Sequence, residues 1–203
     1  MIKIQSRPEL SPTEALEAVR EHFGIDGTLT QLAGERDLNF RLDAEDGHRY
    51  VVKVSSPDEV DEILHIEVDL MRHVARTTQG FSPDVIATPN GDFIVSKADA
   101  QGRENRIRVV EYLEGGLFAD ARPRSPALLH DLGRRLAELD SALGAYPDHP
   151  PARIDFDWAL GRSGLVMERC LDLFQGEDLA LIRGVYDGWT EREKDFLGLG
   201  SQV

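Results

Sequence analysis

The sequence lacks the features that mark disulfide-stabilised, secreted and membrane proteins. It has one cysteine, Cys170, so no disulfide can form within the chain, and the helical pattern around this residue indicates a small buried side chain rather than a nucleophile. No apolar run reaches the roughly 18 residues that a membrane-spanning helix needs, and the first residues lack the pattern of a signal peptide. We therefore expect a cytoplasmic protein without a membrane partner.

Basic residues are scarce. Lys and Arg together number 23 against 37 Asp and Glu, which gives a formal net charge of −14 over 203 residues. An acidic surface repels phosphate backbones and anionic lipids, so we expect no nucleic-acid partner. Metal-ligand spacings are also missing, because the six histidines are scattered and His65 and His73 make a poor zinc pair. The hydrophobic content of 41% is ordinary for a globular protein of one domain or two lobes.

The apolar pattern divides the chain into a first part that mixes helices and strands and a later part that is helical. Ser11 and Glu14 have the spacing of a capping box at the start of a first helix, which Gly24 ends. The pattern then predicts strands at 28–32, 38–42 and 49–54, a long helix over 57–76, a hairpin at 84–87 and 92–97 around Asn90-Gly91, and a fifth sheet strand at 106–113. Every later periodic segment is helical: 125–143, 164–174 and 177–194. This order predicts an α+β fold.

A lysine lies among valines in the strand at 49–54. Because side chains alternate along a strand, Val51 and Lys53 share one face, while Val52 and Val54 share the other. Lys53 is then either an ordinary solvated lysine on a half-buried strand or a cation that projects into a site. The stretches on either side of this strand favour the second interpretation.

Three stretches carry a resemblance to a known family. They are Ala-Gly-Glu-Arg-Asp-Leu-Asn-Phe-Arg-Leu at 33–42, Val-Val-Lys-Val-Ser-Ser-Pro at 51–57, and Tyr-Leu-Glu-Gly at 112–115 followed by Arg-Pro-Arg-Ser-Pro at 122–126. With the order of elements, they resemble the aminoglycoside phosphotransferase family, and within it the hydroxylysine kinases and the kinase-like domains fused to class III aminotransferases. The resemblance runs over about residues 10–165. It implies a protein-kinase-like fold with a five-stranded antiparallel sheet, a long helix and a helical second lobe.

The resemblance also implies an ATP site. Lys53 would contact the α- and β-phosphates, and Glu67 on the long helix would orient it, with Glu59 and Glu62 as rival partners. The loop at 34–37 would cover the phosphates, and the strand ending at 113 would pair with the adenine edge through the Glu111 carbonyl and the Leu113 amide. The implied cofactor-binding residues are Lys53, Glu67, Gly34, Asn39, Val51, Glu111, Tyr112 and Leu113.

The catalytic motif of this family does not occur in the sequence. Its His-x-Asp-x-x-x-x-Asn loop and a later aspartate supply the base and the magnesium ligands. The last asparagine is Asn105, and neither His130 nor His149 has an aspartate two residues on. Asp155 and Asp157 are interpreted as structural caps or substrate-side residues. We therefore assign no catalytic or metal residue, and expect a truncated chain with a nucleotide lobe at 1–113 and a partial helical lobe at 114–203.

Three functional hypotheses follow. The first is the ATP-binding portion of a kinase that phosphorylates a hydroxyl of an amino alcohol or aminoglycoside-like substrate, inactive as this chain and using Mg²⁺ only in the complete protein. The second is a non-catalytic kinase-like interaction module, and the third an unrelated α+β binding domain without nucleotide affinity. Apolar residues along the helix at 125–143 would be exposed in a partial lobe, which predicts self-association as a homodimer.

Overall fold

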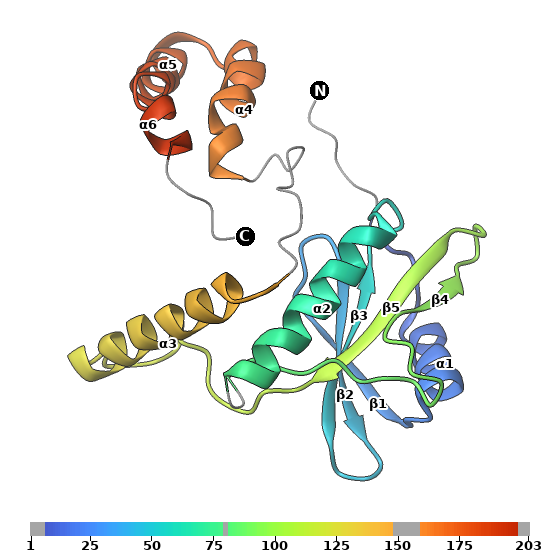
Figure 1. Cartoon of the computed structure of the whole chain (residues 1–203). Coiled ribbons are helices and arrows are strands. Elements are labelled where there is room, and N and C mark those ends of the chain that lie inside the picture. Colours follow the sequence, from blue (N-terminus) through green and yellow to red (C-terminus); the bar gives the residue numbers. More distant parts are fainter. Residues whose placement is uncertain (1–6, 79–80, 148–158, 199–203) are drawn as a thin grey trace. The chain divides into compact units, whose positions relative to one another are not determined.

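The computed structural model describes residues 7–78, 81–147 and 159–198 (Figure 1). The chain divides into two compact units, one within residues 5–148 and one within residues 149–203. Among the described residues, the first contains a sheet and three helices, and the second contains helices. The predicted division at residue 113 stays a prediction. No helix in the described ranges is long and apolar enough to cross a membrane.

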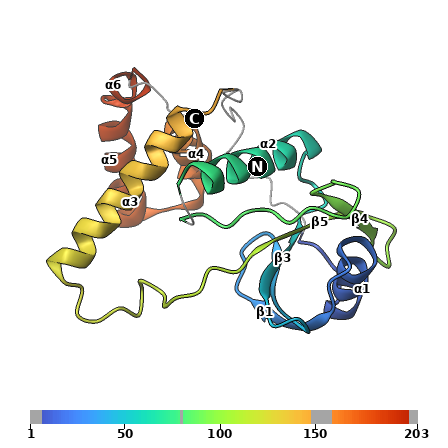
Figure 2. The same ribbon diagram turned by 60° about the horizontal axis from the view of Figure 1, so that its bottom comes forward.

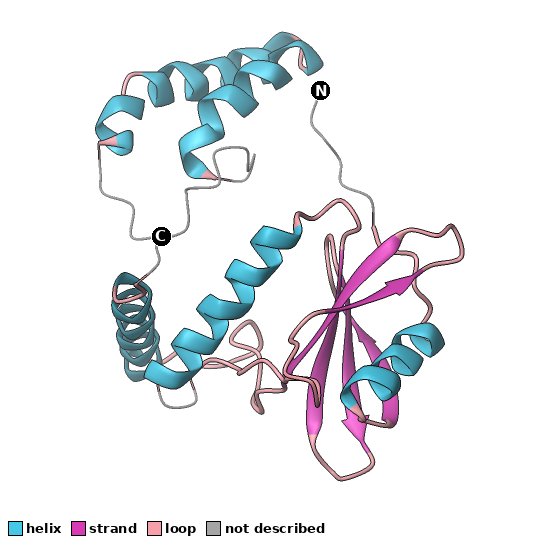
Figure 3. Cartoon of the chain, turned by 45° about the vertical axis from the view of Figure 1, so that its right-hand side comes forward, coloured by secondary structure: helices cyan, strands magenta, loops and turns pink. Residues whose placement is uncertain are grey.

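The sheet of the first unit is antiparallel throughout and follows the predicted pattern (Figure 3). Its strands lie in the order β1 (Gly27–Leu32), β2 (Leu38–Ala44), β3 (Arg49–Ser55), β5 (Glu104–Glu111) and β4 (Val95–Ala98). A turn at Asp46-Gly47 joins β2 to β3, and Gly47 has the positive φ of 88° that favours glycine. The α+β class and the five-stranded sheet are confirmed.

The predicted hairpin at 84–87 and 92–97 is only partly correct. The turn forms, with the Thr88 amide donating to the Asp92 carbonyl at 2.7 Å, and Gly91 has a φ of 91°. Residues 84–87 form no strand, because the Ile86 amide donates to the Val109 carbonyl at 2.8 Å and Val85 makes an isolated bridge with Val110. This segment therefore pairs with the end of β5 rather than with residues 92–97.

Two helices flank the sheet on opposite faces (Figure 2). Helix α1 (Pro12–Phe23) begins with the predicted capping box and ends at Gly24. It packs on the face that carries Val52 and Val54, both fully buried. Helix α2 (Asp61–Thr77) packs on the other face, where Val51 meets a cluster around Val68 and Val110. The predicted alternation of β3 is thus confirmed, while α2 begins four residues later than predicted because residues 57–59 form a turn.

Helix α3 (Pro126–Gly144) completes the first unit. Ser125 caps it, and a hydrogen bond of 2.8 Å joins His73 Nε2 on α2 to the Ala142 carbonyl. Leucines on this helix are exposed, including Leu129 at 50% and Leu136 at 51%. The predicted homodimer stays a prediction.

The described part of the second unit contains η1 (Leu160–Arg162), α4 (Ser163–Cys170), η2 (Leu171–Leu173), α5 (Gly176–Thr190) and α6 (Glu193–Leu197). Gly164 on α4 packs closely against Trp189 on α5. Cys170 is half-buried at the end of α4. His149, Asp155 and Asp157 lie outside the described residues.

Candidate functional site

A cavity of about 1080 Å³ opens on the face of the sheet that α2 covers. Its wall combines β3 and β5 of the sheet, the middle of α2, and the segment from residue 111 to residue 117 that follows β5. Six of the eight predicted cofactor-binding residues line it: Val51, Lys53, Glu67, Glu111, Tyr112 and Leu113. The other two, Gly34 and Asn39, belong to the loop and strand beside it. Residues 60 positions apart in the sequence therefore meet at one site.

Lys53 projects into this cavity and is half-buried. Asn39 lies opposite Lys53 in the β2–β3 register, and its Oδ1 accepts a hydrogen bond of 3.2 Å from Lys53 Nζ. Within the described part of the chain, no carboxylate forms an ion pair with Lys53. Burial lowers the pKa of Lys53, the neighbouring Arg108 cation lowers it further, and Asp37 and Glu67 partly offset both effects. The site thus holds a desolvated ammonium whose charge is not neutralised.

Glu67 has a different partner from the predicted one. Its Oε2 accepts from Arg108 Nη2 at 2.9 Å, so the carboxylate pairs with β5 and does not orient Lys53. The two rival carboxylates form no ion pair with Lys53 in the described part of the chain: Glu59 pairs with Arg36, and Glu62 is exposed. Arg108 is the cross-strand neighbour of Lys53, and its forked guanidinium competes well for a carboxylate from the helix above.

Arg108 is the site residue that the sequence reasoning missed. It lines the cavity, only 5% of its side chain is exposed, and Nη1 also donates to Ser55 Oγ at 3.0 Å. The signal was present in the strand itself. In the stretch at 106–113, Ile107 and Val109 share one face, so Arg108 must share the other face with Val110. That is the same argument that places Lys53.

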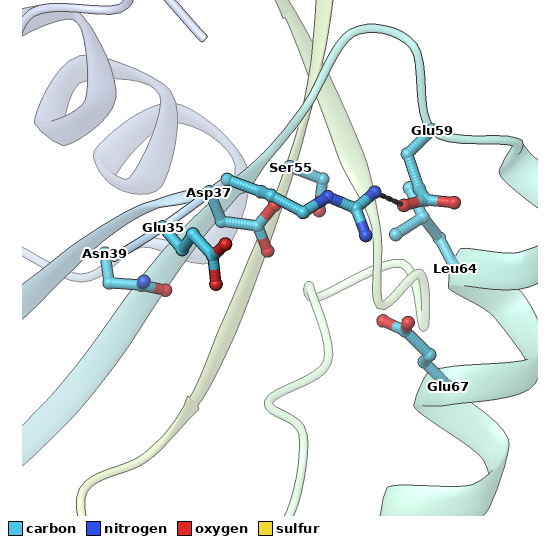
Figure 4. Close-up of a pocket in the computed structure, with 8 residues that line it drawn as sticks. Glu35, Asp37, Asn39, Ser55, Glu59, Leu64 and Glu67 are labelled. Carbon is cyan, nitrogen blue, oxygen red and sulfur yellow. Dashed lines mark hydrogen bonds and ion pairs between the residues drawn. The ribbon is translucent and has the colours of Figure 1, made fainter. Parts of the chain in front are cut away.

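The loop between β1 and β2 lies against the same edge of the site. Arg36 Nη2 contacts Glu59 Oε2 at 2.7 Å, marked by the dashed line in Figure 4, and Asp37 Oδ1 accepts from the Ser56 amide at 3.4 Å. These contacts tie the loop to the turn before α2. A smaller cavity of about 220 Å³ lies here, with Glu35, Asp37 and Asn39 on one side and Glu59 and Glu67 on the other (Figure 4).

Gly34 fits this loop because of close packing rather than unusual backbone angles. A Cβ atom at this position would lie 2.4 Å from the Asp37 carbonyl oxygen and 2.6 Å from Asn39 Nδ2. Only glycine leaves room for both atoms. The glycine therefore helps to place Asn39, which in turn holds Lys53.

The segment after β5 offers backbone groups to the cavity. The Tyr112 amide donates to the Arg49 carbonyl at 3.2 Å, and the Glu111 amide donates to the Asp84 carbonyl at 3.0 Å. In the described ranges, the Leu113 amide has no hydrogen-bond acceptor within the chain. A ligand with a polar edge can therefore bind to this amide without displacing an internal bond.

Comparison with known proteins identifies this architecture. A model of the phosphotransferase enzyme family matches residues 28–192, which is most of the chain. The chain belongs to the phosphotransferase enzyme family. The family resemblance drawn from the three sequence stretches is thereby confirmed. A search of curated proteins finds no significant match.

Solved structures agree with this family at the level of the fold. The amicoumacin kinase hAmiN, in complex with AMP-PNP, Ca²⁺ and Ami, has 16% sequence identity and a TM-score of 0.69, and the alignment covers 95% of this chain. A microcompartment-associated aminopropanol kinase has 18% identity and a TM-score of 0.58, with 80% of this chain covered. This phosphotransferase-family chain spans 56% of the length of each of the two.

The charged side chains and the backbone groups of the cavity determine which ligands this phosphotransferase-family chain can bind. Lys53 and Arg108 supply two cations from adjacent strands, and the segment from residue 111 supplies backbone donors and acceptors. Among the described residues, no group of three or more histidine, cysteine or carboxylate side chains is placed to hold a metal ion. The Mg²⁺ expected with ATP in the complete protein stays a prediction.

Proposed function

We propose that this chain contains the ATP-binding part of a small-molecule phosphotransferase. The observation that carries the proposal is the position of Lys53, a half-buried ammonium in a cavity of about 1080 Å³, with an amide oxygen as its partner and no carboxylate ion pair within the described ranges. A desolvated cation that lacks an internal counterion favours an anionic ligand. The phosphates of a nucleotide supply such a charge, and Lys53 would bind them as a compact point charge.

The remaining cavity residues suit the rest of the nucleotide. The Leu113 amide and the Glu111 carbonyl would pair with the adenine edge, as in the predicted hinge, with Tyr112 between them. Val51 and Ala33 would cover the apolar faces of the base, since both line the cavity. The loop at 34–37 would lie over the phosphates beside Asn39. In this proposal Glu67 belongs to the cavity wall through its pair with Arg108.

The substrate class is a hydroxyl compound that carries an amine. The fold is shared with an aminopropanol kinase and an amicoumacin kinase, which supports the proposal of an amino alcohol or aminoglycoside-like substrate. A formal net charge of −14 favours cationic substrates over anionic ones. The 203 residues contain no His-x-Asp-x-x-x-x-Asn motif. We therefore expect this chain to bind ATP without transferring its phosphoryl group.

Titration calorimetry with ATP tests the proposal. We expect ATP to bind the wild-type chain and Lys53→Ala to weaken binding by roughly tenfold or more, because a charge-assisted contact is lost. Lys97→Ala is the matched control, since Lys97 is also a half-buried strand lysine but lies on β4 beside Glu17, away from the cavity. Equal heats for wild type and Lys53→Ala would remove Lys53 from the site. No heat with any variant would contradict the nucleotide site as a whole and favour the interaction module.

A further inference from the structure

The loop at 34–37, between β1 and β2, is joined to the rest of its unit by side chains. Among the described residues, no hydrogen bond between backbone groups outside the helices and strands involves this loop. Arg36 Nη2 donates to Glu59 Oε2 at 2.7 Å, and Asp37 Oδ1 accepts from the Ser56 amide at 3.4 Å. Both contacts lead to the turn before α2, so the position of the loop depends on them.

The ion pair is the stronger of these two contacts. A guanidinium donor 2.7 Å from a carboxylate makes a short, charge-assisted hydrogen bond, whereas 3.4 Å is beyond the usual range for an amide donor. The side chain of Glu59 is 9% exposed and that of Arg36 is 30% exposed, so solvent screens this pair less than it screens a fully exposed one. Arg36 therefore supplies the main link between the loop and this turn.

This link lies at the phosphate end of the proposed nucleotide site. The cavity of about 220 Å³ that Arg36 lines adjoins the larger one, since Glu67 lines both (Figure 4). Asn39 also lines the smaller cavity, and its Oδ1 accepts the hydrogen bond from Lys53 Nζ. The segment at 111–113, which is proposed to pair with the base, lines the larger cavity and not the smaller one. A displaced loop should therefore affect the phosphates of a nucleotide and not its base.

We propose that Arg36 is a positioning residue of the nucleotide site, whose ion pair with Glu59 holds the loop at 34–37 in the conformation that receives the phosphates of ATP. The inference rests on the proposed function, because it assigns Arg36 a role in ATP binding at that site. Ordering a loop costs conformational entropy, and a loop that is already ordered in the free protein does not subtract this cost from the binding free energy. When only a fraction of the molecules has the loop in place, the apparent affinity falls by that fraction.

Two single substitutions remove the same ion pair from opposite ends. Arg36→Gln and Glu59→Gln should each weaken ATP binding by about threefold to tenfold and leave adenosine binding within about twofold of wild type. The double variant should bind ATP no more weakly than the weaker single variant, because the pair can be lost only once. Arg36→Lys keeps a donor and the positive charge, so it should bind ATP within about twofold of wild type.

Arg106→Gln is the matched control. Arg106 Nε lies 2.7 Å from Asp61 Oδ1 at the start of α2, and the Arg106 side chain is 26% exposed, so this arginine resembles Arg36 in contact distance and exposure. It joins β5 rather than the loop to α2, and its substitution should leave the affinities for ATP and adenosine at their wild-type values. Titration calorimetry with both ligands, on the full 203-residue chain, measures wild type and the five variants.

Hydrogen exchange without ligand tests the ordering of the loop itself. The Ser56 amide is buried and donates to Asp37 Oδ1, so its exchange rate reports whether the loop is in place. Relative to the Val54 amide of β3, it should exchange at least about threefold faster in Arg36→Gln and Glu59→Gln than in wild type. The ratio to Val54 corrects for any loss of stability of the whole unit.

Each other outcome overturns the proposal. If Arg36→Gln weakens ATP binding and Glu59→Gln does not, Arg36 contacts the phosphates directly. If ATP and adenosine weaken by the same factor, the ion pair only stabilises the unit. Should Arg36→Gln not fold, wild-type ATP affinity in Glu59→Gln still refutes the inference. Unchanged Ser56 exchange in a chain that binds ATP refutes the inference and leaves the nucleotide site in place, whereas a wild type that binds no ATP refutes the proposed function and the inference with it.

Discussion

Gly34→Ala is the substitution that most directly tests how the loop at 34–37 supports the site. The new Cβ would lie 2.4 Å from the Asp37 carbonyl oxygen and 2.6 Å from Asn39 Nδ2. Real Cβ atoms essentially never approach a heavy atom within 3.0 Å, so the neighbours must move by several tenths of an ångström. The Asp37 carbonyl belongs to the backbone and cannot rotate away on its own. The loop and the side chain of Asn39 must therefore shift together.

The loss of stability in Gly34→Ala depends on which atoms the new Cβ meets. Overpacking against backbone in a close-packed region costs about 1–3 kcal/mol of the free energy of unfolding. The displacement also reaches Lys53, because Asn39 Oδ1 accepts from Lys53 Nζ at 3.2 Å, which is already a long hydrogen bond. A further shift of Asn39 would break this bond. We therefore expect Gly34→Ala to lower both stability and ATP affinity.

Two other glycines of the same compact unit provide matched controls. Gly27→Ala creates a similar clash at the opposite end of β1, 2.2 Å from the Asp43 carbonyl oxygen, and should destabilise the unit without changing ATP affinity. Gly133 lies in the interior of α3 with open space around its Cβ position. Gly133→Ala should stabilise the helix by about 0.5–1 kcal/mol, because alanine loses less backbone entropy than glycine.

The assay must report on the sheet. Both tryptophans, Trp158 and Trp189, follow residue 148 in the sequence, so tryptophan fluorescence does not follow the unit that contains Gly34. Amide hydrogen exchange of the buried residues of β3 and β5 gives the free energy of opening directly, and calorimetry gives ATP affinity. If Gly34→Ala is as stable as wild type, the close approach is not a constraint. If it is destabilised but binds ATP as Gly27→Ala does, Asn39 does not transmit the change to Lys53.

Two further predictions concern charge and capping. ATP affinity should fall as pH rises through the pKa of Lys53, because only the ammonium form attracts phosphate; burial and Arg108 lower this pKa below 10.5, so the fall begins at a lower pH than for an exposed lysine. Lys53→Arg stays charged and should flatten the pH profile in calorimetry, whereas an unchanged profile would assign the titration to another group. Ser11→Ala removes the acceptor of the Glu14 amide at the start of α1 and should cost about 1 kcal/mol of stability by hydrogen exchange; full protection of the α1 amides in this variant would contradict the capping role.

Local periodicity was enough to predict where Lys53 points. The alternation of β3 assigns Val52 and Val54 to the buried core and Lys53 to the other face, and the structure confirms both. The same holds for the capping box of α1 and for the turn at Asn90-Gly91, since each depends on neighbours within a few residues. Features set by short-range sequence are the ones that a single sequence specifies well.

Contacts between elements that are distant in the sequence could not be predicted from local periodicity. Three glutamates near the start and middle of α2 could each reach the sheet, and the sequence does not give the rotation and translation of the helix that select Glu67 for Arg108. The hairpin at 84–97 failed for a similar reason. Its turn is local and forms, but the choice of β5 as the partner of residues 84–86 depends on hydrogen bonds over more than 20 positions.

The pairing that the sequence could not specify also determines how readily the cavity accepts an anion. The Lys53 ammonium has three donors, and within the described ranges it donates one hydrogen bond, to Asn39 Oδ1 at 3.2 Å. In the proposed site, the charge of an anionic ligand would offset the desolvation that lowers the pKa of Lys53. Arg108 on β5 holds Glu67 in an ion pair, with Arg108 Nη2 2.9 Å from Glu67 Oε2. In the proposed site, Arg108 on β5 would therefore stabilise the fold, and Lys53 on β3 would bind the ligand.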